Sequence, residues 1–203
     1  MVLLVMINHL KNKQMYLFYD TETTGVPKDY RAPAIEWPRM VQLAWIVHNE
    51  KRVAIDTGNC IIKPDGFEIP KAAADIHGIT TEMALEKGSN LKDVLEIFKV
   101  RLDKYKYIIG HNISFDRKIL RGELIREKVE YDSSKKIKIC TMMLSTKFCA
   151  IPNKYGFKWP KLQELHEKLF EKEFEDAHDA MADITATARC FWELVDKEII
   201  KLK

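Results

Sequence analysis

The chain has 203 residues, of which 46 % are hydrophobic and 31 % charged, and its formal net charge is +3. These values are ordinary for a soluble globular protein, and the length suits one sizeable core rather than two domains. A charge of +3 permits a polyanionic partner without indicating one. The apolar opening "MVLLVMINHL" is too short to span a bilayer, so we expect no membrane association.

The cysteines are scattered and form no CxxC pair, which argues against a zinc knuckle or a disulfide framework. They are Cys60, Cys140, Cys149 and Cys190. We therefore expect a reducing, cytoplasmic compartment. We also expect residues 1–14 to form an N-terminal extension and residues 15–203 to form a single domain.

Strand-like segments come first along the chain. Apolar and aromatic runs bounded by turn residues predict strands at 15–20, 40–48, 54–64, 105–112 and 137–141. Residues 26–39 carry three prolines and read as a surface loop. The strands at 15–20, 40–48 and 54–64 follow one another without a helix, and helices come later, so we expect one α/β domain with a mixed sheet.

Helix-like segments dominate the second half. Leu91, Val94, Leu95, Phe98 and Leu102 form one apolar stripe, which predicts a helix capped by Ser89 or Asn90. Apolar spacing also predicts helices over about 114–129, within 161–170, and over about 178–198.

The first strand ends in a pair of acids, Asp20 and Glu22, in the segment "LFYDTETTG". Side chains alternate along a strand, so both acids point to the same face. Two neighbouring carboxylates repel each other, and burial makes their ionisation harder still. Such a pair must be hydrated, share a proton or bind a cation, and for an isolated DxE the hydrated pair is the simplest reading.

A second acid, Asp116, follows the segment "IIGHNISFD" in the first turn of the next helix. Acids are favoured there by the helix dipole, so Asp116 alone indicates little. We expect His111 and Asn112 to tie down the preceding turn through side-chain hydrogen bonds.

The third segment is "EDAHDAMADITATARCF", which contains His178, Asp179 and Asp183. Asp179 and Asp183 share a helical face, whereas His178 lies roughly 140° from Asp183. Spacing alone therefore leaves either aspartate as the inward acid and puts His178 at the helix start.

Taken in order, "DTETTG", "HNISFD" and "HDAMAD" resemble the three motifs of the DnaQ-like (DEDDh) 3′–5′ exonucleases. The resemblance spans about residues 16–195. It implies a ribonuclease H-like fold, a mixed five-stranded β-sheet flanked by α-helices. It also implies a set of catalytic residues and selects Asp183 over Asp179. That catalytic set is Asp20, Glu22, Asp116, His178 and Asp183.

By the same resemblance, the four acids would hold two divalent cations, Mg²⁺ or Mn²⁺, which suit hard oxygen ligands. Asp20 would contact both ions, Glu22 and Asp183 would complete one site, and Asp116 would hold the second. His178 would take the proton from the attacking water. The expected partner is single-stranded DNA or RNA with a free 3′-hydroxyl, and the expected product a nucleoside 5′-monophosphate.

Substrate contacts are expected from two regions. The family resemblance points to Thr23, Thr24 and Gly25 beside the terminal nucleotide. Phe115 is expected to wedge against a base or to join the core. The segment "KYGFKWPK" interleaves Lys154, Lys158 and Lys161 with aromatic residues including Trp159, a pattern that suits a stacked single strand or, equally, a solvated loop.

Two other functions stay open. A non-catalytic nucleic-acid-binding module would be expected to lack one of the five motif residues. A hydrolase of small nucleotide phosphoesters would use the same metals without a polymer groove. The sequence does not decide whether the substrate is DNA or RNA. It also does not decide whether the role is proofreading, repair or RNA turnover.

Overall fold

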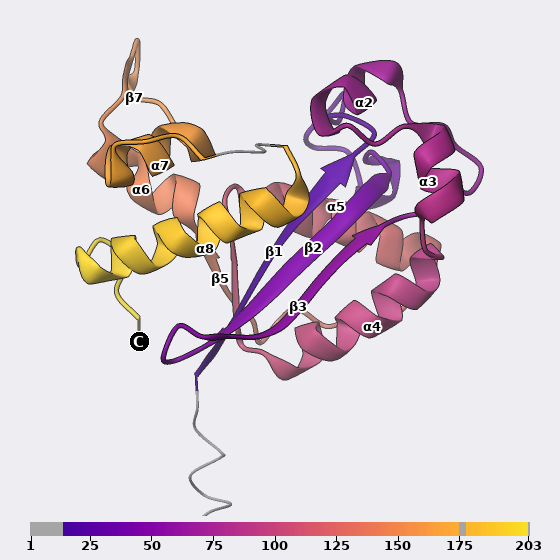
Figure 1. Ribbon diagram of the computed structural model, residues 1–203, viewed down its shortest axis with the longest axis horizontal. Coiled ribbons are helices and arrows are strands. Elements are labelled where there is room, and N and C mark those ends of the chain that lie inside the picture. Colours follow the sequence, from indigo (N-terminus) through magenta and orange to yellow (C-terminus); the bar gives the residue numbers. More distant parts are fainter. Residues whose placement is uncertain (1–13, 175–177, 203) are drawn as a thin grey trace, which may run out of the picture.

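The computed structural model describes residues 14–174 and 178–202, and its centre is a mixed five-stranded sheet of order β3-β2-β1-β4-β5 (Figure 1). β1 pairs antiparallel with β2 and parallel with β4. β2 pairs antiparallel with β3, and β4 pairs parallel with β5. The strands are β1 Met15–Thr23, β2 Met40–Asn49, β3 Ala54–Ile61, β4 Tyr107–Gly110 and β5 Ile137–Cys140.

β1 is the middle strand and is covered on both faces. Leu17 and Tyr19 point into one hydrophobic cluster, and Tyr16 and Phe18 point into another. All four side chains are almost fully buried. This alternation fixes the direction of every side chain that follows in β1, including the acids at its end.

Helices α4 (Leu91–Lys104) and α5 (Ile113–Arg126) supply the cluster on the Tyr19 face. The Phe18 face is covered by α6 (Thr141–Cys149), α7 (Leu162–Phe170) and α8 (Ala180–Asp196). Figure 1 shows α8 lying across the sheet with its first turn near the end of β1. The sheet is therefore sandwiched between two helical layers, and the end of β1 is a point where both layers can contribute side chains.

Smaller elements complete the fold. α2 (Lys71–His77) and α3 (Thr81–Lys87) pack a small apolar cluster against Val41 at the start of β2. The 3-10 helix η1 (Ala34–Glu36) lies within the proline-containing loop, and the short strands β6 (Pro152–Asn153) and β7 (Gly156–Phe157) form a hairpin.

The predicted ribonuclease H-like fold class is confirmed. The five predicted strands and four predicted helices are present, and Asn90 is the cap of α4. α2, α3, α6 and the β6-β7 hairpin were not predicted. The predicted extension over residues 1–14 lies outside the described residues except for Gln14. Within the part of the chain that the structure describes, no helix has the length and apolar character needed to cross a membrane.

Candidate active site

Three of the predicted acids converge at the end of β1. Asp20 and Glu22 point to the same face of the sheet, toward α8, where Asp183 lies in the first turn. Each of these three residues offers a carboxylate oxygen within 4.8 Å of the others, and each side chain is half-buried. The strand alternation and the position of α8 thus create one compact group of oxygen ligands.

Asp179 has a different position. It is the N-cap of α8, and one of its carboxylate oxygens accepts hydrogen bonds from the backbone N–H groups of Met181 and Ala182, both at 3.0 Å. Its other oxygen accepts from Nε2 of Gln42 at 3.2 Å. Asp179 therefore starts the helix, and Asp183, four residues on, joins the acid group.

Asp116 approaches from the opposite helical layer. One of its oxygens accepts hydrogen bonds from the backbone N–H of Thr21 at 3.1 Å and from the Thr21 hydroxyl at 2.8 Å. Thr21 lies between Asp20 and Glu22 and points to the other face of the sheet. Asp116 is only 3 % exposed. Its position beside the acid group is therefore fixed by the strand that carries Asp20 and Glu22.

His178 lies at the entrance to this group. Its backbone N–H donates to Oδ1 of Asp183 at 3.3 Å, its side chain is exposed, and its backbone has a positive φ of 73°. A positive φ is uncommon for a residue other than glycine and directs the chain sharply into the helix cap. The imidazole is thus near Asp183 and open to solvent.

The acids strongly disfavour one another's ionisation. Burial, followed by the charges of Asp116, Asp183 and Glu22, raises the pKa of Asp20 well above its ordinary value. Burial and the charge of Asp183 raise the pKa of Glu22 to about 8. Burial also raises the pKa of Asp116 to about 7, against the opposing effect of the Thr21 hydrogen bonds, and that of Asp183 to about 6.

These shifts and the donor set fit a bound divalent cation. Carboxylate oxygens are the ligands that Mg²⁺ and Mn²⁺ prefer, and a nearby positive charge would favour the ionised form of each acid. With only protons available, Glu22 would be largely neutral in neutral solution and Asp116 would be about half ionised. The arrangement therefore meets the chemical requirements of a metal site.

The hydroxyls of Thr23 and Thr24, which are expected to lie beside the substrate, already form hydrogen bonds within the protein. The Thr23 hydroxyl donates to the backbone oxygen of Gly25 at 2.6 Å, and Gly25 has a φ of 136°, which favours glycine. The Thr24 hydroxyl accepts from the backbone N–H of Arg39 at 3.0 Å, and the Thr24 N–H donates to the Arg39 oxygen at 3.0 Å. The segment is a braced turn at the edge of the site.

The two predicted aromatic substrate contacts, Phe115 and Trp159, differ in their exposure to solvent. Phe115 is half-buried, and its ring centroid lies 5.6 Å from that of Trp37 in the loop between β1 and β2. Trp159 is 63 % exposed. It precedes Pro160, whose oxygen is 2.9 Å from Nε2 of His111 just after β4. Trp159 is therefore tethered to the sheet edge where β1 and β4 end, with its side chain largely exposed.

Sequence reasoning missed two supporting residues. Thr21 holds Asp116, and Gln42, opposite Glu22 in β2, contacts the Asp179 cap and is 3.4 Å from the backbone nitrogen of Ala180. Strand alternation contained a signal for Thr21, since it puts this hydroxyl on the face that Asp116 occupies. Gln42 carried no comparable signal, because its partner is 137 residues away. The predicted structural role of His111 fits its contact with the Thr141 hydroxyl at 3.0 Å.

Comparison with known proteins places this geometry in a protein class. The model of the RNase T exonuclease family matches residues 17–191, a span that contains all of the acids described above. The chain belongs to this exonuclease family, whose members are hydrolases. The predicted resemblance to DnaQ-like exonucleases is thereby confirmed.

Particular relatives extend this result. A PolC-type DNA polymerase III of Mycoplasmopsis pulmonis (strain UAB CTIP) is 32 % identical over 123 residues, which are 59 % of this chain and 8 % of the polymerase. An exonuclease of Escherichia phage 186 is 28 % identical over 178 residues, 84 % of this chain and 83 % of the phage protein.

Solved structures of E. coli exonuclease I agree in fold. Its complex with a dT13 oligonucleotide is 26 % identical, with a TM-score of 0.71 over 90 % of this chain. The complex with dA16 is 26 % identical, with a TM-score of 0.70 over 91 % of this chain. The chain spans 41 % of the length of exonuclease I in both complexes.

The acid group gives a prediction for the metal-free protein. The pKa of Glu22 is about 8 in the folded chain against an ordinary 4.5, so between these values the folded state binds the extra proton. The free energy of unfolding contributed by Glu22 therefore falls as pH rises through this window. We expect Glu22→Gln to raise the melting temperature of chelated protein at about pH 9 and to change it little at about pH 5.

Calorimetry with a chelator, repeated with excess Mg²⁺ or Mn²⁺, checks this prediction. The cation should stabilise the unaltered protein at the higher pH and stabilise the variant less. Glu96→Gln, on the exposed side of α4, is the control with the same chemical change. A variant that lowers the melting temperature of chelated protein at both pH values would contradict the electrostatic origin of the effect.

Proposed function

We propose that the protein is a metal-dependent 3′–5′ exonuclease that releases nucleoside 5′-monophosphates from a free 3′ end of single-stranded nucleic acid. The observation that carries the proposal is the convergence of Asp20, Glu22 and Asp183, with Asp116 held beside them by Thr21. Membership of the exonuclease family supports it. So do the oligonucleotide complexes of E. coli exonuclease I, with which this chain shares its fold.

The four acids together would bind two divalent cations. Asp20 would contact both, Glu22 and Asp183 would complete one site, and Asp116 would serve the other. When bound, Mg²⁺ or Mn²⁺ would lower the pKa of the attacking water and offset negative charge on the phosphate and the leaving 3′ oxygen.

The chain's own residues would perform the remaining steps. The exposed His178 imidazole would accept the proton of the attacking water, a role typical of histidine at neutral pH. The hydrogen bond from the His178 backbone to Asp183 would keep the base close to the carboxylates. The braced turn from Thr23 to Gly25 would border the terminal nucleotide with its backbone, and the exposed Trp159 ring would stack on a base.

Polarity and metal dependence are tested together. We expect a 5′-labelled single strand to shorten stepwise with its label retained when Mg²⁺ or Mn²⁺ is present. A 3′-phosphate should block the reaction, because the terminal nucleotide needs a free 3′-hydroxyl, and chelation should stop it. Gel analysis of matched DNA and RNA strands gives polarity and sugar preference in one experiment.

Other results of that experiment favour the alternatives. Immediate release of a labelled mononucleotide would show the opposite polarity, and unchanged cleavage after thorough chelation would exclude the metal mechanism. Hydrolysis of mononucleotide esters without cleavage of strands would indicate a small-phosphoester hydrolase. Metal-independent strand binding without cleavage would indicate a binding module.

The two aspartates at the start of α8 form a matched pair of variants. We expect Asp183→Asn to abolish hydrolysis, because it removes a metal ligand. Asp179→Asn should retain most of the activity, because asparagine is about as good an N-cap as aspartate. Single-turnover rates and metal titration by calorimetry measure both effects, and a more damaging Asp179→Asn would contradict the assignment.

His178→Asn separates the catalytic role of the histidine from a structural one. Asparagine tolerates the positive φ of this position but is not a base, so the melting temperature and metal binding should change little. Loss of a general base typically lowers the rate about 10²–10⁴-fold, with partial recovery at higher pH. A destabilised variant with an unchanged single-turnover rate would refute the assignment.

A further inference from the structure

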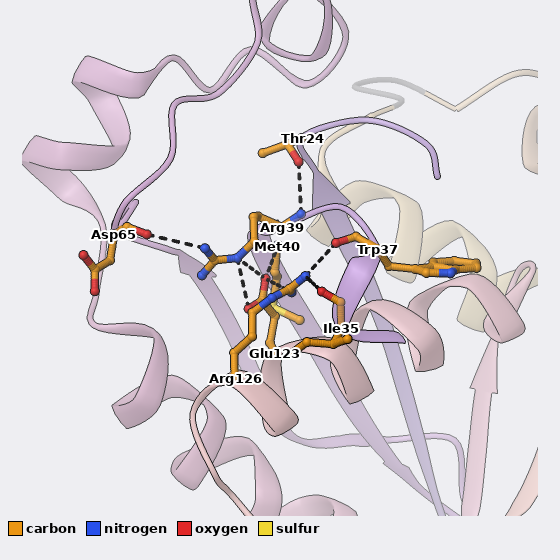
Figure 2. Close-up of polar contacts among 8 residues, drawn as sticks. All are labelled: Thr24, Ile35, Trp37, Arg39, Met40, Asp65, Glu123 and Arg126. Atoms are coloured by element: carbon orange, nitrogen blue, oxygen red, sulfur yellow. Dashed lines mark hydrogen bonds and ion pairs between the residues drawn. The ribbon is translucent and has the colours of Figure 1, made fainter. Parts of the chain in front are cut away.

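The loop between β1 and β2, residues 26–39, is folded back onto α5. Nη2 of Arg126 donates to the backbone oxygens of Ile35 at 2.6 Å and Trp37 at 2.7 Å (Figure 2). At Gly122 in α5, an added Cβ would lie 2.4 Å from the backbone oxygen of Ala34. Glycine at this position therefore permits the loop backbone to rest directly on the helix.

Glu123 fixes the far end of the same loop. Its side chain is fully buried and accepts hydrogen bonds from Nε of Arg39 at 3.0 Å and from the backbone N–H of Met40 at 2.8 Å (Figure 2). Nη1 of Arg126 lies 3.2 Å from the same carboxylate. The backbone N–H of Arg39 also donates to the Thr24 hydroxyl, and the backbone oxygen of Arg39 accepts from the Thr24 N–H. The loop is thus joined rigidly to α5 and to the turn that borders the active site.

On the outer side of the contact between the loop and α5 lies a groove of about 510 Å³, whose charged lining residues are all positive. Arg31 lines it from the loop, and Arg117, Lys118 and Arg121 line it from α5. Among the described residues that line it, none is acidic. The neighbouring cavity between α4 and α5 shares Arg117 and Arg121 with the groove, but it also contains Asp103, Glu130 and Asp132.

Such a concentration of cations is costly without a partner, because like charges repel. Lys118 is anchored, since its Nζ donates to the Tyr30 oxygen at 3.0 Å and lies 4.6 Å from the centre of the Trp37 ring. Arg31 and Arg121 are exposed. A chain with a net charge of only +3 has therefore placed four cations around one groove, and only two of them, Arg117 and Arg121, also line the neighbouring cavity that contains acids.

Two residues that line the groove are close neighbours of Asp116 in the sequence of α5. Ser114 and Arg117, which line it, flank Asp116 in the first turn of α5. Asp116 points inward to Thr21, while Ser114 is exposed. The groove therefore begins at the turn of α5 that carries Asp116.

We propose that this groove binds the phosphate backbone of the single-stranded substrate upstream of its 3′ end. The inference rests on the proposed function and adds a positioning surface to it, made by the loop over residues 26–39. Arginine suits this role because its guanidinium binds phosphate oxygens in a bidentate manner.

The test measures binding separately from hydrolysis. In chelator, fluorescence anisotropy of a long 5′-labelled oligothymidylate gives affinity as a function of salt. Each phosphate contact to a single strand contributes a slope of about −0.7 to the plot of log K against log[salt], so Arg31→Gln with Arg121→Gln should make the slope less steep by about 1.4. Arg31→Gln alone should give about half of that change.

The matched control is Lys51→Gln with Lys201→Gln, which removes the same charge from exposed positions. Lys51 lies in the β2-β3 turn, at the opposite end of the sheet from the acids, because Asn49 pairs with Met15 at the start of β1. The control should keep the slope of the unaltered protein.

Equal slopes in the groove variant and the control would overturn the proposal. Hydrolysis of the same oligonucleotide by the unaltered protein, assayed with Mg²⁺ or Mn²⁺, is measured separately. Cleavage with equal slopes would leave the exonuclease function intact and remove the groove from it. Failure of the unaltered protein to cleave any strand would overturn the proposed function itself.

Discussion

The alternation of side chains along a fully buried central strand is the constraint on which the rest of the active site depends. Because Tyr16 and Phe18 face one helical layer and Leu17 and Tyr19 face the other, the next residues of β1 have no freedom of direction. Asp20 and Glu22 must face α8, and Thr21 must face α5. A shift of one residue in this strand would exchange the acids with the threonine and would also bury the wrong side chains in both clusters.

The repulsion among the acids becomes understandable in this setting. The carboxylates are held close together by the sheet core. The free-energy cost of their mutual repulsion is therefore offset by apolar packing elsewhere in the fold. Thr21 and the backbone of His178 donate hydrogen bonds to Asp116 and Asp183, which partly offsets the cost of burying them. The fold itself thus holds the carboxylates in one compact group.

Local patterns in the sequence predicted the strands, the α4 stripe and a cap at Ser89 or Asn90, because these depend on neighbours a few residues away; Asn90 is the cap in the structure. The family resemblance, rather than spacing, selected Asp183. In the structure Asp179 is the cap of α8, and Asp183 lies with Asp20 and Glu22. The engagement of the Thr24 hydroxyl by Arg39 could not be predicted, because its partner is 15 residues away across an irregular loop. α2 and α3 were missed because each has seven residues, too few to show a clear apolar period.

The way in which the loop between β1 and β2 is attached has a consequence for variation among related chains. Several of its hydrogen bonds with α5 are accepted by its own backbone oxygens, at Tyr30, Ile35 and Trp37, and backbone oxygens are supplied by every amino acid. Gly122 and Arg126 of α5 therefore hold the path of the loop while leaving exposed positions such as Arg31 free to change. Substitution on this outer surface would then alter its charge without altering the hydrogen bonds that fix the loop on α5.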